Sequence, residues 1–405
     1  MTSHEKPSPI GGKLLDSPVK GLLALFALSA VVVIYRFAAG LGPVSNMTDG
    51  YTWGIWEPVN VVVFTGVGAG AYGVALLCYL LNKGQYHALV RISVLVGAIA
   101  YTLGATSILV ALGRPWNSFW LPYTPYWNLG SNLLEVALCV LSYVLVLWLE
   151  VLPSVFEGAA GSRSPRLQAI GATWGPRLNR VMPYLLALAI LLPTMHQSSL
   201  GGLMLIAGPK IHPLWHSALL PTLFLVSCLS MGYGAVVALT SVLRVTWRAR
   251  ADLPLLAGIS RVNGALLALY LVLRAGEVVV NGKLRYLGAN FATLLFLFEL
   301  ALFAAPVVML FSRRVAADRG KLYLASLLAL AAGAVYRIDV YLTMYRPAGW
   351  SDGVAIPAGW NYFPSLGETV VTAGAISFGL AVFIAVSRLF PVVVVDDATR
   401  TSSRS

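Results

Sequence analysis

Charged residues are scarce in this sequence, and their scarcity excludes a soluble globular protein. Asp, Glu, Lys and Arg make up 11% of the 405 residues, whereas hydrophobic residues make up 58%. A soluble domain carries about 25% charged residues. The composition therefore predicts an all-α, polytopic membrane protein. The net charge of +12 does not indicate nucleic-acid binding, because the basic residues are concentrated in the loops of one membrane side.

Cysteine is also rare. Cys78, Cys139 and Cys228 each stand alone within an apolar segment, and the sequence contains no C-x-x-C pair. An iron–sulfur cluster needs about four thiolate ligands, so this chain is not expected to hold one. The same spacing gives no sign of a disulfide framework.

Histidine is too sparse for a cytochrome with two haems. Each b-type haem needs two axial ligands that face each other inside a helix bundle. Only His196 lies well inside an apolar stretch, so the count excludes two haems and argues against a dedicated metal site. A single haem on His196 and His216 stays open as an alternative. The five histidines are His4, His87, His196, His212 and His216.

Ten apolar stretches are long enough to cross a membrane, which takes about 20 residues. They predict a ten-helix transmembrane domain over 20–390, between an N-terminal tail (1–19) and a C-terminal tail (391–405). The stretches are 20–41, 57–82, 89–112, 129–150, 181–207, 216–243, 257–279, 290–312, 320–345 and 366–390.

The basic residues predict how these helices are oriented. With both termini in the cytoplasm, 20 of the 28 Lys and Arg lie on the inner side and six on the outer side, as the positive-inside rule requires. The inner segment 151–180 is rich in Gly, Ser and Arg and is interpreted as a flexible cytoplasmic loop. Trp, Tyr and Pro crowd the outer connections, either as interfacial anchors or as a docking surface for a partner. These connections are 49–58, 113–127, 209–216 and 346–365.

Polar residues within the apolar stretches gather toward the outer leaflet in this topology. A charge in hydrocarbon costs about 2.5–3.5 kcal/mol on insertion scales, so such residues at one depth indicate a shared site. Glu299 is the exception, because it falls close to the middle of the membrane. The outer set is Asn60, Glu135, His196, Gln197, Arg274, Glu277, Arg337 and Asp339.

These polar residues differ in how readily a structural role explains them. Arg274 and Glu277 are three residues apart on one helical face and could neutralise each other. His196 could be a neutral core histidine. Glu135 is harder to explain in this way, because it is expected about two turns inside its helix, among apolar neighbours and without a basic residue within a turn. An isolated carboxyl suits a group that takes up and releases protons.

Several runs resemble one known family, the integral membrane subunit of Hyb-type nickel–iron hydrogenases. It is part of the broader polysulfide-reductase/NrfD group of membrane subunits. The most specific run is LLPTMHQSSLGGLM (191–204), which surrounds His196. The other runs occur in the same order along nearly the whole chain. They are IGGKLLDSPV (10–19), NKGQYHALVR (82–91), GRPWN (113–117), SNLLEVALC (131–139), HPLWHS (212–217) and RAGEV (274–278).

The resemblance implies a fold of two four-helix bundles with one extra helix at each end. It implies a subunit of the bacterial inner membrane that binds a quinone, menaquinone or ubiquinone, near the outer face and contains no haem. Electrons would come from hydrogen, oxidised by periplasmic large and small hydrogenase subunits in anaerobic respiration. A ferredoxin-like iron–sulfur subunit would pass them on. The chain would then be the quinone-site subunit of a hydrogen:quinone oxidoreductase complex and would not be catalytic alone.

Roles for the polar residues follow from the resemblance and from the chemistry of quinones. Where the family is expected to have an Asp, this chain has Asn60, which can bind a quinone oxygen but cannot carry a proton. Glu135 and His196 would then deliver protons or bind the quinone head. Glu299 would belong to an inner proton path, should protons cross the membrane. The remaining residues, Gln197, Arg274, Glu277, Arg337 and Asp339, would shape and polarise the quinone pocket.

Three alternatives stay open. A quinone-linked complex of the same group could act on sulfur compounds or nitrite instead of hydrogen, and neighbouring genes would decide this. A secondary transporter would place its site near the midplane, with broken helices, whereas this cluster lies off-centre. A purely structural anchor would keep full activity after Glu135→Gln.

Overall fold

The computed structural model describes residues 7–48, 51, 53–81, 83–162, 164–247, 252–344 and 362–394. In these segments, ten helices are long and apolar enough to cross a membrane, so the prediction of a multi-pass, all-helical membrane protein is confirmed. Most of the expected outer loop 346–365 lies outside the described residues, as do parts of both tails and of the connection 49–58.

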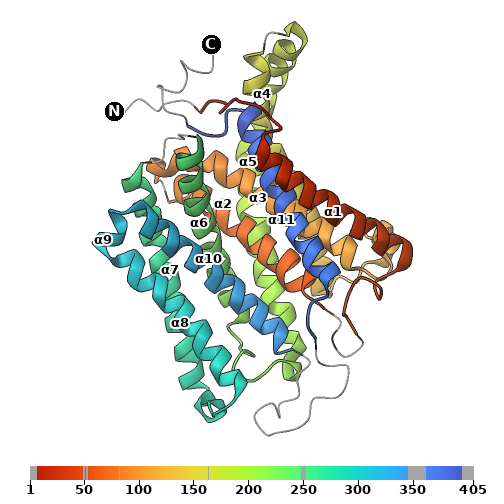
Figure 1. Ribbon diagram of the computed structural model, residues 1–405, viewed down its shortest axis with the longest axis vertical. Coiled ribbons are helices and arrows are strands. Elements are labelled where there is room, and N and C mark those ends of the chain that lie inside the picture. Colours follow the sequence, from red (N-terminus) through yellow and green to blue (C-terminus); the bar gives the residue numbers. More distant parts are fainter. Residues whose placement is uncertain are drawn as a thin grey trace.

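Within the described residues, the chain forms eleven α-helices, one π-helix and short 3₁₀ turns (Figure 1). The π-helix η1 continues directly into α2, and together they form the second span. The helices are α1 (Ser17–Ala39), η1 (Trp56–Val63), α2 (Phe64–Tyr79), α3 (His87–Ala111), α4 (Asn132–Ala160), α5 (Pro165–Ala207), α6 (Leu220–Trp247), α7 (Leu253–Val280), α8 (Phe291–Phe311), α9 (Arg313–Ala316), α10 (Arg319–Leu342) and α11 (Leu366–Leu389). The 3₁₀ turns are η2 (Gly84–Tyr86), η3 (Pro115–Trp120), η4 (Thr124–Tyr126), η5 (Gly208–Lys210) and η6 (Lys283–Tyr286).

The expected two bundles are present. One contains α2, α3, α4 and α5, and the other contains α6, α7, α8 and α10. They meet mainly along α2 and α6, where Gly70 and Gly232 allow the two backbones to touch. A methyl group on Gly70 would collide with the carbonyl of Cys228. Small residues that permit such close approach are typical of helix contacts in membranes.

The two extra helices, α1 and α11, pack against each other beside the bundles (Figure 1). The rings of Phe26 and Phe378 stack at 4.4 Å, and Gly374 makes room for Ser29. The chain segments outside these helices are also joined, because Ser8 pairs with Val393 in an isolated antiparallel bridge. We call the side of the molecule that carries this bridge the terminal face, and the other side the opposite face.

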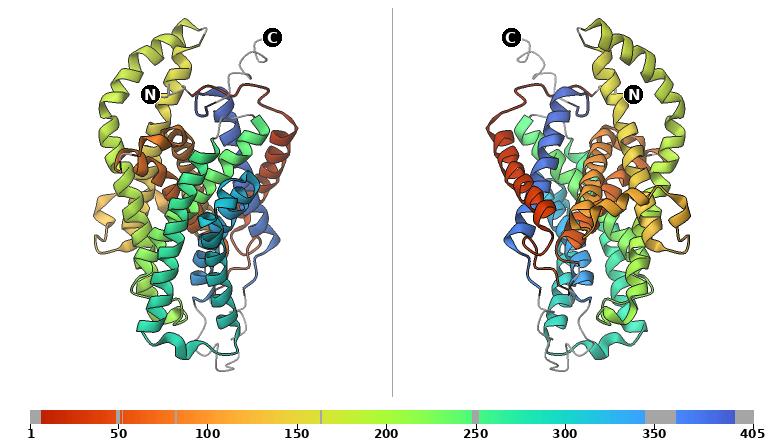
Figure 2. Two further views of the ribbon diagram at one scale, coloured as in Figure 1. Left: turned by 90° about the vertical axis from the view of Figure 1, so that its left-hand side faces the viewer. Right: turned by 90° about the vertical axis from the view of Figure 1, so that its right-hand side faces the viewer.

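The prediction of a flexible loop over 151–180 is wrong. Residues 151–160 and 165–180 of this segment are helical, because α4 extends to Ala160 and α5 starts at Pro165. The 43 residues of α5 span about 64 Å at 1.5 Å per residue, about twice the thickness of the hydrocarbon core. The α4–α5 hairpin therefore projects beyond the other helices (Figure 2). Gly171, one of the residues that suggested a loop, instead lets α5 pack against the carbonyl of Phe156.

Candidate functional site

The π-helix η1 sits where α2 meets the second bundle. Asn60 lies within it and is fully buried. Arg337 of α10, also fully buried, donates from Nη1 to the carbonyl of Val62 at 3.0 Å and from Nη2 to the carbonyl of Phe224 at 2.6 Å. Its guanidinium thus joins η1, α6 and α10. Short π-helical segments are frequent at functional sites, where they re-aim side chains.

His196 and Gln197 of α5 are fully buried in the first bundle. His196 Nδ1 shares a hydrogen bond of 3.0 Å with the hydroxyl of Tyr101, from α3. Gln197 Nε2 donates to the hydroxyl of Thr65, from α2, at 3.4 Å. Three helices therefore fix these two side chains, about 16 Å from the end of α5 at the opposite face.

Several polar atoms of this region are buried without a hydrogen-bond partner among the described residues. They come from η1, α5 and α10, and they include donors as well as acceptors. Each such atom costs about 1–3 kcal/mol unless a ligand or water satisfies it. We call the four residues that carry them the orphan cluster, and the atoms are Asn60 Oδ1 and Nδ2, His196 Nε2, Gln197 Oε1 and Arg337 Nε.

Glu135 lies closer to the end of its helix than the sequence indicated. It occupies the first turn of α4 and is half-buried, instead of about two turns inside. Ser199 of α5 donates to Glu135 Oε1 at 2.7 Å, and Ser199 is three residues after His196. The carboxyl thus stands beside the helix that carries His196, between that residue and the opposite face. A carboxylate in a first helical turn is also favoured by the helix dipole, which is a structural reason for its presence.

A second polar cluster lies in the other bundle, around Glu299 of α8. Trp215 Nε1 donates to Glu299 Oε2 at 2.7 Å, and the Tyr270 hydroxyl donates to Oε1 at 2.8 Å. Arg274 Nε lies 3.3 Å from the same Oε1. All four side chains are fully buried, and both oxygens of the carboxylate are occupied.

Arg274 forms the ion pair with Glu277 that the sequence suggested, at 3.9 Å, and a shorter one of 3.3 Å with Glu299. Glu277 also forms an ion pair with Lys283 and accepts from Asn281 Nδ2 at 3.0 Å. Sequence spacing finds only partners on the same helix, and Glu299 is on another helix. Asp339 of α10 is buried, and its Oδ2 has no hydrogen-bond partner among the described residues.

The structure thus divides the predicted residues into two groups. Asn60, His196, Gln197 and Arg337 gather where the two bundles meet, with Glu135 on one side. Arg274, Glu277, Glu299 and Asp339 form the second group, in the second bundle, and aromatic rings lie between the two groups. Tyr336, the neighbour of Arg337, packs its ring 5.2 Å from the ring of Tyr270.

Sequence reasoning missed the aromatic members of both clusters, which are Tyr101, Trp215 and Tyr270. The sequence does contain a feature that points to these aromatic residues. A Tyr or Trp buried inside an apolar span normally directs its hydroxyl or N–H at a polar partner. Weighing the tyrosines of the spans alongside their charged residues would have identified Tyr101 and Tyr270.

The alternative of one haem on His196 and His216 is not supported, because His216 lies before α6, outside the spans, and not inside a helix bundle. His196 pairs with Tyr101, whereas His212 lies outside the spans and its Nδ1 accepts the backbone N–H of Leu214. In the described part of the chain, no group of three His, Cys, Asp or Glu side chains gathers as metal ligands would. We therefore assign no step to a haem or a metal.

The chain is similar to several known membrane subunits. Over 96% of its length it is 34% identical to the "Probable Ni/Fe-hydrogenase 2 b-type cytochrome subunit" of Escherichia coli, of which the match covers 95%. Over 60% of its length it is 27% identical to "Menaquinone reductase, integral membrane subunit" of Nitratidesulfovibrio vulgaris, of which 58% is covered. "Protein NrfD" of Escherichia coli is 30% identical over 46% of the chain and 58% of that protein.

The family model described as "Polysulphide reductase, NrfD" matches residues 43–345, which include η1, both bundles and both polar clusters. The resemblance seen in the sequence is thereby confirmed, and so is the expected helical architecture. The chain belongs to the polysulphide reductase/NrfD family of multi-pass membrane proteins.

Proposed function

We propose that this chain is the membrane anchor and quinone-reactive subunit of a nickel–iron hydrogenase complex. The orphan cluster carries the proposal. A quinone head is a flat apolar ring with two carbonyl oxygens, and it needs a few fixed hydrogen-bond donors in an apolar site. Asn60 Nδ2 and Arg337 Nε are buried donors without a partner among the described residues, and His196 Nε2 is a third group that can bind a carbonyl oxygen.

The relatives support the choice of partner. The Escherichia coli relative, matched over 96% of the chain, has hydrogenase in its name, and the Nitratidesulfovibrio relative is named a menaquinone reductase. In the complex, periplasmic large and small hydrogenase subunits oxidise hydrogen to two protons and two electrons. A ferredoxin-like iron–sulfur subunit, docked on the opposite face, passes the electrons to the quinone, since this chain has too few thiolates for a cluster of its own.

Reduction of the quinone to quinol takes these two electrons and two protons. His196, with Tyr101 behind it, is the residue that we assign to proton transfer at the quinone oxygen. Glu135, joined to α5 through Ser199, supplies one of the two protons from the side of the opposite face. Asn60, Gln197 and Arg337 hold and polarise the quinone head. The second cluster, with Arg274, Glu277, Glu299 and Asp339, sets the electrostatic field around that pocket.

We place the protein in the bacterial inner membrane with the terminal face in the cytoplasm. Twenty of the 28 basic residues support this orientation. The opposite face then looks into the periplasm, on the side where His196 and Glu135 lie. The electron donor and the quinone pocket meet on that side.

Purification in a mild detergent tests the proposal. A tag on this chain should retain a nickel-containing large subunit and an iron–sulfur subunit. The purified complex should reduce 2,3-dimethyl-1,4-naphthoquinone with hydrogen. The second candidate is a complex of the same family that acts on polysulfide or nitrite, and the similarity to "Protein NrfD" supports it. Co-purification of a catalytic subunit for either compound would replace the hydrogenase assignment. A complex that reduces no quinone with any donor would overturn the quinone role itself.

A further inference from the structure

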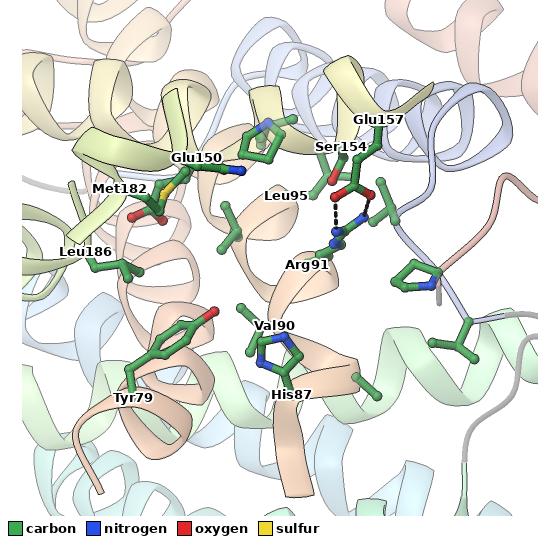
Figure 3. A pocket seen from close by; sticks show the side chains of 18 of the residues that line it. Tyr79, His87, Val90, Arg91, Leu95, Glu150, Ser154, Glu157, Met182 and Leu186 are labelled. Carbon is green, nitrogen blue, oxygen red and sulfur yellow. Dashed lines mark hydrogen bonds and ion pairs between the residues drawn. The ribbon is translucent and has the colours of Figure 1, made fainter. Parts of the chain in front are cut away.

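A cavity of about 750 Å³ opens at the terminal face of the first bundle, far along the helices from the orphan cluster. Side chains of α3, α4 and α5 line it together with the end of α2 (Figure 3). Pro7, Val392 and Val394 from the two chain ends form part of its wall. A cavity of this size that reaches the surface has room for many water molecules.

Arg91 and Glu157 line the solvent-exposed part of this cavity and neutralise each other. Arg91 Nη1 and Nη2 donate to the two carboxylate oxygens of Glu157 at 2.7 and 2.8 Å, and both side chains remain partly exposed (Figure 3). Arg91 also donates to the carbonyl of Pro391. This pair therefore has the geometry of a structural ion pair at a water-exposed site.

Glu150 of α4 lines the same cavity but has a different environment. Its Oε1 accepts the hydroxyl of Tyr72 at 2.9 Å, and its Oε2 is buried without a partner among the described residues. No ion pair neutralises this carboxyl in the described part of the chain. The titratable groups that face it are Tyr72 and Tyr79 of α2, His87 and Arg91 of α3, Glu157 on its own helix, and Asp252 before α7.

A line of tyrosines leads from Glu150 to the orphan cluster. The ring of Tyr72 lies 6.3 Å from that of Tyr143, and Tyr143 lies 4.5 Å from Tyr101. Tyr101 bonds to His196 at 3.0 Å. The Tyr143 hydroxyl, in the middle of this line, is buried without a partner among the described residues. Hydroxyl groups can relay protons because each both donates and accepts a hydrogen bond.

We propose that Glu150 takes up protons from the water of this cavity and that Tyr72, Tyr143 and Tyr101 relay them to His196, a role that rests on the proposed quinone function. In each transfer a hydroxyl gives its proton to the next group and receives one from the group before it. No electron moves, and the relay returns to its starting state. One water on each side of the Tyr143 hydroxyl would bridge the two gaps in the line, and rotation of that hydroxyl would then set the direction of its hydrogen bond.

Glu299 is a weaker candidate for this role than the sequence suggested. Both of its oxygens accept hydrogen bonds, and Arg274 holds it in an ion pair. Moving a proton onto Glu299 would leave the buried charge of Arg274 without its partner. Glu150 has a free oxygen and direct contact with the cavity.

Sealed proteoliposomes test the relay. The purified complex is inserted in one orientation, supplied with hydrogen and 2,3-dimethyl-1,4-naphthoquinone, and the pH is set separately on the two sides. In the wild type, quinone reduction should consume protons from the terminal-face side, and its rate should follow the pH there. Glu150→Gln and Tyr72→Phe should each slow quinone reduction at least 10-fold and remove this dependence. Hydrogen-driven dye reduction should not change.

Glu157→Gln is the matched control, because it changes the same group in the same cavity and on the same helix. It should leave the uptake of protons as in the wild type. The relay is overturned when Glu150→Gln still takes protons from the terminal-face side at the wild-type ratio. A wild-type complex that reduces quinone with protons from the opposite face alone also refutes the relay, while the quinone function stands. A wild type that reduces no quinone refutes the quinone function first.

Discussion

Arg337 reaches from α10 across the junction of the two bundles and donates a hydrogen bond of 3.0 Å to the carbonyl of Val62, which is 275 residues away in the sequence. A second bond to the carbonyl of Phe224 fixes the guanidinium on α6. One fully buried cation thus joins η1, α6 and α10. The Nε of the same side chain has no partner among the described residues, so it can donate a hydrogen bond to the quinone in the pocket that we propose.

Replacing Arg337 with Gln should weaken the junction of the bundles. The loss of its bonds to two buried carbonyls should cost roughly 1–3 kcal/mol. The melting temperature in detergent, followed by circular dichroism, should fall. Arg177→Gln, at a residue of the projecting part of α5, is the control and should leave it unchanged. An Arg337→Gln protein as stable as the wild type would contradict the joining role.

The contact of α2 with α6 should not tolerate even one methyl group. Gly70→Ala would force the backbones apart, because the added carbon would meet the carbonyl of Cys228. Overpacking of this kind costs typically about 1–3 kcal/mol. Gly276→Ala in α7 meets nothing within 4 Å and should stabilise its helix by about 1 kcal/mol. Equal melting temperatures for both variants would show that the glycine contact is unimportant.

Glu299→Gln should destabilise the second bundle because it leaves the charge of Arg274 buried without its main partner. Breaking a buried ion pair from one side costs about 3–5 kcal/mol. The double variant Arg274→Met/Glu299→Gln should recover part of that loss, and thermal unfolding measures both. A Glu299→Gln protein that unfolds at the wild-type temperature would show that the Arg274–Glu299 pair does not stabilise the fold.

His212 should make stability depend on pH. Burial lowers the pKa of His212 from 6.5 to about 4. Between these two values the unfolded chain binds a proton that the folded chain does not, so stability should fall as the pH drops from 6.5 toward 4. It should be highest above pH 6.5. His212→Gln should flatten the dependence of the melting temperature on pH over this window, relative to the wild type. An unchanged slope in His212→Gln would disprove the assignment.

Asn60→Leu should weaken quinone binding more than it slows the chemistry. The substitution removes the amide donor and acceptor but keeps the volume of the side chain roughly the same. The loss of one placed hydrogen bond should raise the apparent KM for 2,3-dimethyl-1,4-naphthoquinone about 10-fold, which corresponds to about 1.4 kcal/mol. Steady-state kinetics with hydrogen as donor measure this. A lower kcat at unchanged KM would argue for a different role.

The sequence was sufficient for the fold because hydrophobic length decides which segments can cross a membrane. All ten spans were found, and the family resemblance supplied their grouping into bundles. The α4–α5 hairpin was misread because Gly and Ser predict a loop only where no neighbour packs against them. Gly171 packs against Phe156, and this contact is invisible in the local sequence.

The site was harder to predict because its partners come from distant parts of the chain. Asn60, His196, Gln197 and Arg337 were identified from the cost of polar groups in an apolar span. Which of them meet was not predictable. Spacing on one helix predicts the ion pair of Arg274 with Glu277, but it cannot show the closer partner, Glu299, which is 25 residues away. The sequence does not single out Glu150 as a site residue, because Glu150 is at the end of a predicted span, where a charge costs little.

We infer that His196 acts at the quinone and not in the transfer of electrons to it. The complex with His196→Gln, compared with Thr194→Val on the exposed side of α5, should be assayed with two acceptors. Hydrogen-driven reduction of 2,3-dimethyl-1,4-naphthoquinone should fall at least about 100-fold, the usual range for a lost proton-transfer group. Hydrogen-driven reduction of benzyl viologen should stay at the wild-type rate. Quinone reduction at the wild-type rate in His196→Gln would show that His196 takes no part in proton transfer to the quinone.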